Sequence, residues 1–266
     1  MNKRIVLLFL YDNKMDVTFE EIGICLIASY LREKGIEVKL IAKNSEQLED
    51  EEIFTFHPDV LGFVVYQQNK YLVRKQCRHF KKIQPDIITC AGGVYATTNT
   101  LELLQETPEL DFCVFGEGEE TLYELMMHID DPSFWQHIPG VAFRNMNGTV
   151  TKNPPRHLEQ NLDTYPFAAR DFLDKQKFGV VKIVGSRGCC AYCTYCTSKV
   201  VFPKWRYRSI RNIVDEIEFL SQKYGVKAFN FTDNSIEDPD KHATRIKELA
   251  NYILKRGLEI KYNVYA

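Results

Sequence analysis

Half of the chain's eight cysteines lie close together in one short segment. They are Cys189, Cys190, Cys193 and Cys196, in the run V-G-S-R-G-C-C-A-Y-C-T-Y-C-T-S-K. The segment before them, 178–185, is apolar and rich in valine and isoleucine, which predicts a buried strand. The cysteines therefore follow the end of a strand, where ligands bind in open α/β sheets and barrels.

Metal binding or redox chemistry is the expected use of these thiols, since clustered cysteines in a chain without a recognisable secretory signal rarely form disulfides. Cys189, Cys193 and Cys196 give the spacing C-x3-C-x2-C. Starting from Cys190 gives C-x2-C-x2-C, the opening of a ferredoxin run, which needs a further cysteine followed by proline. A zinc site could use all four thiols, although the adjacent pair would have to bend back onto one ion. Three thiolates on a tetranuclear iron–sulfur cluster would leave one iron for a substrate or cofactor.

The first spacing, with R-G before Cys189 and Tyr195 just before Cys196, resembles the radical S-adenosylmethionine (SAM) enzymes. The resemblance implies a 4Fe-4S cluster ligated by Cys189, Cys193 and Cys196, with SAM chelated at the open iron. An electron from a donor such as flavodoxin or ferredoxin would cleave SAM to methionine and a 5′-deoxyadenosyl radical. It also implies that Gly188 lets the loop turn and that the Tyr195 backbone borders the adenine. Cys190, where the family often has proline, is expected to ligate nothing.

The composition is that of a globular protein, with 266 residues, 45% of them hydrophobic and 26% charged. A net charge of −2 argues against general nucleic-acid binding. No run of about 18 apolar residues predicts a membrane span, and the expected location is the cytoplasm. The basic run at 199–211, which holds Lys204, Arg206, Arg208 and Arg211, is interpreted as a solvated loop, with contact to substrate or phosphate as the alternative.

Strands and helices are expected to alternate along the first half of the chain. The predicted strands are 4–11, 37–42, 60–66, 87–90 and 111–115, and the predicted helices are 18–35, 46–56, 70–83, 99–106 and 119–129. This rhythm predicts a parallel sheet with helices on both faces and a binding rim at the strand ends. A hairpin about the N-G turn within 135–153 follows. Cys25, Cys77, Cys90 and Cys113 are interpreted as buried, inert thiols.

Four fragments, in this order, add a second resemblance. They are A-G-G-V-Y-A-T at 91–97, F-G-E-G-E-E-T-L at 115–122, I-P-G-V-A-F-R at 138–144 and Y-P-F-A-A-R-D at 165–171. Together they resemble radical SAM enzymes that have an N-terminal cobalamin-binding domain, and they imply cobalamin across the strand ends. The residues expected near it are Tyr11, Asp12, Gly92, Gly93, Gly116, Glu117 and Gly118. The glycines could instead serve only tight turns. The loop after the first strand, Y-D-N-K-M-D, lacks the histidine that ligates cobalt in many cobalamin proteins.

The remaining chain is predicted to contain a helix over 209–224, a strand over 226–232, a helix over 239–256 and a strand over 259–265. By the resemblance, Asp233 at the end of the second of these strands helps to hold SAM, and a helix cap or salt bridge is the alternative. The last strand would leave an unpaired edge. We therefore expect the chain to be part of a longer enzyme.

The sequence thus predicts an α/β protein with two domains. Residues 1–174 are expected to form a Rossmann-like, flavodoxin-like domain of the cobalamin-binding type, and residues 175–266 the first part of a radical SAM (β/α) barrel. The expected reaction is cobalamin-dependent methylation of an unactivated carbon on a small-molecule or peptide substrate. Two alternatives remain: a cobalamin-independent radical SAM reaction such as rearrangement, cyclisation or methylthiolation, and a non-enzymatic, metal-bearing structural module.

Overall fold

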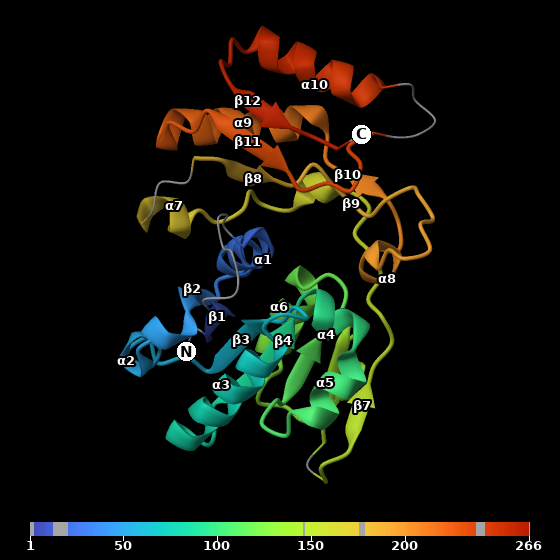
Figure 1. Cartoon of the computed structure of the whole chain (residues 1–266). Helices are drawn as coiled ribbons and strands as arrows, with labels where there is room; N and C mark the ends of the chain where they lie inside the picture. The colour runs from blue at the N-terminus through green and yellow to red at the C-terminus, as the bar shows by residue number, and fades with distance from the viewer. Residues whose placement is uncertain (1–2, 13–20, 146, 176–178, 238–242, 266) are drawn as a thin grey trace. The chain divides into compact units, whose positions relative to one another are not determined.

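The computed structural model describes residues 3–12, 21–145, 147–175, 179–237 and 243–265. The described chain forms two compact units (Figure 1). The first unit ends at Leu158, and the second contains the described residues from Glu159 onward together with 21–22. The segment 159–174, which the sequence analysis placed in the first domain, clusters with the second unit, where Arg170 binds Glu216.

The first unit is built on a seven-stranded sheet of order β2-β1-β3-β4-β5-β6-β7. The strands are β1 (Arg4–Tyr11), β2 (Glu37–Asn44), β3 (Val60–Val64), β4 (Ile88–Gly92), β5 (Phe112–Val114), β6 (Val141–Arg144) and β7 (Val150–Lys152). The first five are parallel, and β6 and β7 add the predicted hairpin in antiparallel pairing. The order 2-1-3-4-5 is flavodoxin-like, and its switch point lies between β1 and β3.

Helices connect the parallel strands of the first unit. They are α1 (Ile22–Glu33), α2 (Asp50–Phe54), α3 (Lys70–Ile83), α4 (Val94–Thr98), α5 (Thr100–Glu106) and α6 (Glu119–Met127), with the short turns η1 (Ser45–Gln47) and η2 (Trp135–His137). Right-handed crossovers place α1 on one face and α3 on the other, as Figure 1 shows. The predicted α/β class is confirmed. The start expected for the first helix at Thr18 lies outside the described residues.

The second unit contains a three-stranded parallel sheet of order β12-β11-β8. Its strands are β8 (Val181–Ile183), β11 (Ala228–Phe231) and β12 (Lys261–Asn263), and β9 (Ser186–Arg187) and β10 (Arg206–Tyr207) form a separate antiparallel pair. Its helices are α7 (Asp171–Lys175), α8 (Ser198–Val201), α9 (Ile210–Tyr224) and α10 (Thr244–Lys255), preceded by the turn η3 (Leu162–Thr164). Residues 239–242, where the last helix was expected to begin, lie outside the described part of the chain.

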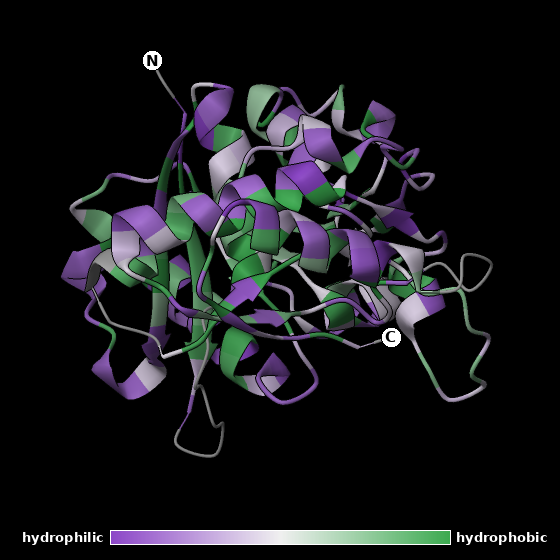
Figure 2. Cartoon of the chain, turned by 90° about the horizontal axis from the view of Figure 1, so that it is seen from above, coloured by the Kyte–Doolittle hydropathy of each residue, from purple (hydrophilic) through white to green (hydrophobic). Residues whose placement is uncertain are grey.

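Helix α9 shows how the sequence specifies these elements. The Ser209 side chain accepts a hydrogen bond from the Asn212 N–H (3.1 Å), which caps the helix N-terminus. Gly225, with φ of 68°, ends the helix in a left-handed conformation. Between them, Ile213, Ile217 and Leu220 are fully buried against the strands. Figure 2 shows the same alternation of hydrophobic and hydrophilic residues along the helices.

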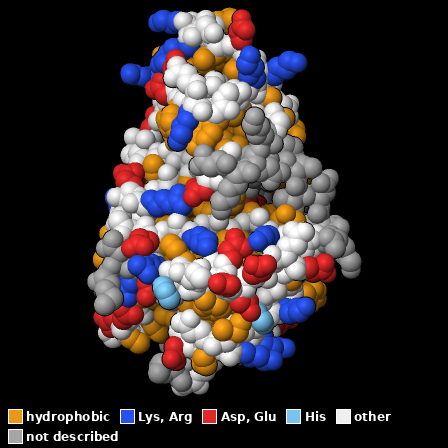
Figure 3. Space-filling view, turned by 90° about the vertical axis from the view of Figure 1, so that its left-hand side faces the viewer, with side chains coloured by type: hydrophobic (Ala, Val, Ile, Leu, Met, Phe, Trp, Pro, Cys, Tyr) orange, Lys and Arg blue, Asp and Glu red, His pale blue; other side chains and the backbone are white. Residues whose placement is uncertain are grey.

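The surface carries charges of both signs. On the face shown in Figure 3, acidic and basic side chains are interspersed rather than segregated. This distribution agrees with the small net charge of −2. No helix among the described residues is long and apolar enough to cross a membrane.

Candidate functional site

The switch point of the first sheet is held by one buried side chain, Asn69, which is 1% exposed. Its amide Nδ2 donates to the carbonyl oxygens of Leu10 and Val64, both at 3.0 Å. Its Oδ1 accepts from the backbone N–H of Tyr66 at 2.8 Å. One neutral amide therefore joins the carboxyl ends of β1 and β3. Residues 67–69 lie between a predicted strand and a predicted helix, and the sequence analysis gave Asn69 no role. Its side chain does not cap the following helix, so no helix-capping signal could have identified this contact.

Aromatic rings gather at the same edge of the sheet. The ring centroids of Phe9 and Tyr66 lie 6.0 Å apart in an edge arrangement, and those of Phe9 and Tyr11 lie 5.9 Å apart. Tyr11 ends β1, and Asp12 follows it, so both expected cobalamin contacts lie at the switch point. A large planar cofactor needs such a partly apolar ledge at a strand end.

Gly92 and Gly93 turn the chain from β4 into α4. Gly93 has φ of 95°, and an added Cβ would lie 3.3 Å from the Val65 carbonyl oxygen. The Gly92 carbonyl accepts from the Val65 N–H at 2.8 Å, and the Val65 carbonyl accepts from the Tyr95 N–H at 3.0 Å. The turn by itself therefore explains Gly93, and the expected approach to cobalamin stays a prediction.

The second glycine-containing loop, after β5, follows the same logic. Gly116 has φ of 78°, and its N–H donates to the Thr97 hydroxyl at 3.1 Å. An added Cβ on Gly118 would lie 2.9 Å from Cδ1 of Ile27, so Gly118 allows α1 to pack closely. Glu117 lies between them and is half-buried. The loop therefore ends beside the first helix of the sheet, at the same edge as Gly93.

The cysteine loop of the second unit leaves β9 and is largely exposed. Cys189 and Cys190 are half-buried, and Cys193 and Cys196 are exposed. Among the described residues, no three Cys, His, Asp or Glu side chains lie within ligating reach of one point. The structure thus places the predicted ligands on one loop without gathering them. The Tyr195 side chain on this loop is 88% exposed.

Backbone amides nevertheless point at two of the sulfurs. The Ala191 N–H donates to Sγ of Cys189, and the Ser198 N–H donates to Sγ of Cys196, both at 3.4 Å. Hydrogen bonds to cysteine sulfurs are among the features by which proteins tune iron–sulfur clusters. Three thiols on a loop at a strand end therefore fit an iron–sulfur cluster in donor chemistry. The remaining four thiols fit the interpretation of inert core residues, because all four are buried, and burial raises the pKa of Cys90 to about 12.

Gly188 is required by its surroundings. Its φ is 88°, and an added Cβ would lie 2.4 Å from the carbonyl oxygen of Lys204. The contact exists because β9 and β10 pair directly before it, with Arg187 opposite Arg206. The glycine thus fixes where the cysteine loop leaves the strand.

Asp233 follows β11 and is 3% exposed. Its Oδ2 accepts from the Gly185 N–H at 2.9 Å, whereas its buried Oδ1 has no hydrogen-bond partner in the described structure. The Ser186 hydroxyl, which lies nearby, donates to the Ser235 carbonyl at 3.1 Å. Burial raises the pKa of Asp233 to about 6, against the lowering effects of Ser186 and the Gly185 N–H. A buried carboxylate with a free oxygen at a strand end suits a cationic ligand. A salt bridge is the alternative use of this carboxylate, and the Arg245 guanidinium acts to lower its pKa.

The basic run does not form the expected solvated loop throughout. Of its basic side chains, Arg206 and Arg208 are only 4% and 8% exposed, whereas the flanking Lys204 and Arg211 are exposed. Arg206 donates to the Glu159 carbonyl at 2.6 Å, and Arg208 binds a buried carboxylate. The correction has a simple cause: alternate residues of this short run point inward, because β10 pairs with β9.

The chain combines two α/β units. The first is a flavodoxin-like sheet with aromatic rings at its switch point, and the second carries three thiols on a loop and a buried carboxylate after a parallel strand. The B12 binding domain family matches residues 11–126, which run from the end of β1 into α6.

Curated relatives match most of the chain. An uncharacterized methyltransferase of Pyrococcus horikoshii is 31% identical over an alignment of 253 residues, which covers 91% of this chain and 54% of that protein. The anaerobic magnesium-protoporphyrin IX monomethyl ester cyclase of Rubrivivax gelatinosus is 27% identical over 256 residues, 91% of this chain and 45% of that protein. The chain thus spans about half the length of these relatives.

Solved structures show the same fold over nearly the whole chain. The cobalamin-dependent S-adenosylmethionine radical enzyme OxsB matches with a TM-score of 0.83 and 22% identity, over 98% of this chain and 38% of that one. The radical S-adenosylmethionine methyltransferase TsrM of Kitasatospora setae matches with a TM-score of 0.77 and 18% identity, over 96% of this chain and 51% of that one. The chain therefore has the fold of these solved structures over nearly its whole length, and its first part matches the B12 binding domain family, in agreement with the predicted resemblance.

Proposed function

We propose that the chain belongs to an enzyme that cleaves SAM reductively and methylates an unactivated carbon with the help of cobalamin. The observation that carries the proposal is the second unit's strand-end geometry. Asp233 follows β11 and accepts a hydrogen bond from Gly185, so a buried carboxylate lies beside the backbone that leads through β9 into the C-x3-C-x2-C loop. The B12 binding domain match over 11–126 supports cobalamin as the second cofactor.

Each residue has a defined part in this proposal. Cys189, Cys193 and Cys196 hold a 4Fe-4S cluster, and Gly188 sets the direction in which their loop leaves β9. Asp233 binds the cationic part of SAM through its free Oδ1. When bound at these residues, a reduced cluster would supply one electron for SAM cleavage, and cobalamin would supply a methyl carrier. The protein's own contribution is to orient SAM and to exclude water from the radical.

The expected cobalamin site lies along the strand ends of the first sheet. Tyr11, Asp12 and the ring of Tyr66 form the ledge at the switch point, where ligands of such sheets bind. Gly92–Gly93 and Gly116–Gly118 border it. The electron donor and a small-molecule or peptide substrate are the proposed partners, and we propose a cytoplasmic location.

A second candidate function is radical cyclisation without methyl transfer. The relative from Rubrivivax gelatinosus, named a cyclase, favours it. The two candidates differ in the fate of the SAM methyl group, because a methyltransferase places it on the product and a cyclase does not. Methyl-labelled SAM therefore separates them once a substrate is found.

The decisive experiment uses the native gene product, purified and reconstituted without oxygen. Incubation with SAM and dithionite should yield 5′-deoxyadenosine, and the bound corrin should show its visible absorbance. A Cys193→Ala variant is the control that should yield none. Tetrahedral zinc in place of iron, or no 5′-deoxyadenosine from the iron-loaded protein, would contradict the radical function.

A further inference from the structure

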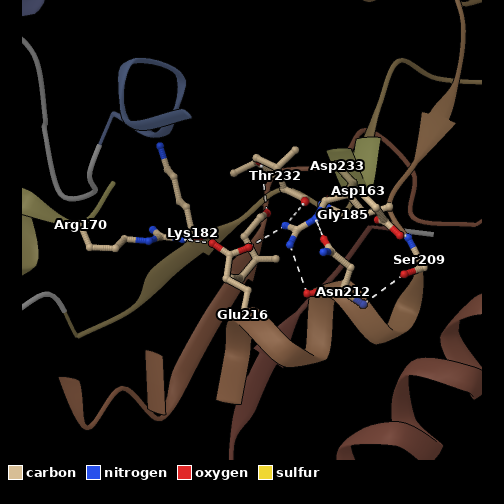
Figure 4. A network of polar contacts seen from close by, with 12 residues as sticks. Asp163, Arg170, Lys182, Gly185, Ser209, Asn212, Glu216, Thr232 and Asp233 are labelled. Carbon is tan, nitrogen blue, oxygen red and sulfur yellow. Dashed lines mark hydrogen bonds and ion pairs between the residues drawn. The ribbon is translucent and has the colours of Figure 1, made fainter. Parts of the chain in front are cut away.

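A network of buried ion pairs lies in the core of the second unit. Glu216 on α9 is 2% exposed and accepts from Nη2 of Arg170 at 2.7 Å and from Nη1 of Arg208 at 2.6 Å (Figure 4). Burial alone would raise the pKa of Glu216, but Arg208 and Arg170 hold it below its ordinary value. The carboxylate is therefore ionised, and three charges lie together inside the unit.

Such a network is an expensive way to gain stability. Burying an ion costs several kcal/mol, and well-packed apolar residues often stabilise a core at least as well. What the ions provide is direction, because a planar guanidinium holds its partners in fixed positions. The question is therefore which groups this network positions.

Arg208 extends the network to the end of β8. Its Nη1 also donates to the Val184 carbonyl at 3.0 Å, and its backbone N–H donates to the Gly185 carbonyl at 2.9 Å. The Gly185 N–H in turn donates to Oδ2 of Asp233 at 2.9 Å. An unbroken chain of hydrogen bonds thus runs from Glu216 to Asp233, as Figure 4 shows.

Arg170 fixes the other side of the same strand. Its Nη2 donates to the Lys182 carbonyl at 3.2 Å as well as to Glu216. Arg170 comes from the segment that precedes β8, and its partner Glu216 comes from the helix that follows β10. One carboxylate therefore clamps β8 through two arginines, at Lys182 and at Val184.

We propose that Glu216, through Arg208 and Arg170, is a positioning residue that sets the end of β8 and thereby the direction of the Asp233 carboxylate toward its cationic ligand. The inference rests on the proposed function for the identity of the ligand, SAM. Glu216 is buried and binds Arg170 and Arg208, so in this proposal it acts through them rather than on the ligand. The last link is Gly185, whose N–H donates to Oδ2 of Asp233, so a shift of this strand end moves the carboxylate.

The test compares Glu216→Gln with Glu218→Gln in the full chain. Both residues lie on α9, but Glu218 contacts the partly exposed Arg256 and Gln222, and no contact among the described residues connects it to β8. Hydrogen exchange by mass spectrometry reports the amides of 181–188, and titration of the reconstituted, reduced protein by electron paramagnetic resonance reports SAM binding. Glu216→Gln should exchange faster at 181–188, but not in β12, and bind SAM roughly tenfold more weakly. Glu218→Gln should match the wild type in both.

A milder variant covers the case in which Glu216→Gln does not fold. Arg208→Lys keeps the positive charge but cannot hold both the Val184 carbonyl and Glu216, so the same local exchange and weaker binding are expected. Uniformly faster exchange with unchanged SAM affinity in the folded variant would overturn the positioning role. If the wild type binds no SAM, the proposed function fails, whereas the exchange at 181–188 still decides whether Glu216 positions this strand end.

Discussion

The two units hold the carboxyl ends of their parallel strands by opposite means. In the first unit, the neutral amide of Asn69 joins β1 to β3, and aromatic rings line the edge. In the second unit, the ionised Glu216 clamps β8 through Arg170 and Arg208. Both solutions satisfy buried carbonyl groups that would otherwise be costly to bury.

The difference matches the ligand proposed for each rim. Cobalamin is large, and amide side chains surround its corrin ring, so an edge of aromatic rings and a neutral amide suits it. SAM carries a cationic sulfonium and an ammonium group, so a rim with a buried, directed carboxylate suits it. Variants in one rim should therefore leave the other cofactor in place.

The largest effect is expected from Cys193→Ala. Loss of one of three thiolates should abolish the cluster and with it SAM cleavage, because the cysteines are the only proposed protein ligands. Iron content and 5′-deoxyadenosine formation measure this loss. The corrin absorbance should stay, and its disappearance would show that the two rims are not independent.

Gly188→Ala should nearly match that loss by a different route. The added methyl would meet the Lys204 carbonyl at 2.4 Å at a φ of 88°, so the backbone must move. We expect a cost on the order of 3 kcal/mol or more. Chemical denaturation and iron content measure it. Gly179→Ala is the matched control, since an added Cβ there meets nothing within 4 Å. Equal behaviour of the two variants would contradict the argument.

Asp233→Asn should change the pH dependence of both stability and SAM binding. The folded pKa of about 6 lies above the ordinary 3.8, so the folded protein binds the proton more tightly. The stability of the wild type relative to Asp233→Asn should therefore fall as pH rises from about 4 to about 6, by on the order of 3 kcal/mol. Denaturation at several pH values measures it.

The same titration acts on the ligand in the opposite sense. A cation prefers the ionised carboxylate, so SAM affinity of the wild type should rise as pH rises through about 6. Asp233→Asn should bind SAM weakly at every pH. A wild-type affinity that does not depend on pH in this range would count against Asp233 as the contact.

Asn69→Ala tests the neutral rim. It leaves the carbonyls of Leu10 and Val64 and the N–H of Tyr66 without their partner, which should cost about 2 kcal/mol. Corrin affinity should fall while SAM binding to the reconstituted protein stays. Asn161→Ala is a control, because that side chain caps an exposed turn in the second unit. Weaker SAM binding in Asn69→Ala would blur the distinction between the rims.

Cys190→Ala should have the smallest effect. In the C-x3-C-x2-C spacing it ligates nothing, so iron content and SAM cleavage should equal those of the wild type. Loss of iron in this variant, with retention in Cys189→Ala, would instead favour the ferredoxin-like spacing.

Local patterns determined much of this protein. The helices Lys70–Ile83 and Ile210–Tyr224 and the strand Arg4–Tyr11 have the bounds that periodicity, caps and stop residues predict. The order of the glycine-containing fragments indicated the B12 binding domain match, and together with the cysteine spacing it indicated the fold that the solved structures share. These features depend on neighbours within a few residues, which the sequence displays directly.

The tertiary structure alone decided which partners the buried polar and charged side chains have. Glu216 follows Ile213 and precedes Ile217 and Leu220 on the same helix face, so its burial could have been suspected from spacing. Its two arginines are 46 and 8 residues away, and no local pattern pairs them with it. The same holds for Asn69, whose acceptor Leu10 is 59 residues away. A buried polar group is stable only with its partners in place, and distant partners meet only when the strands are assembled into a sheet.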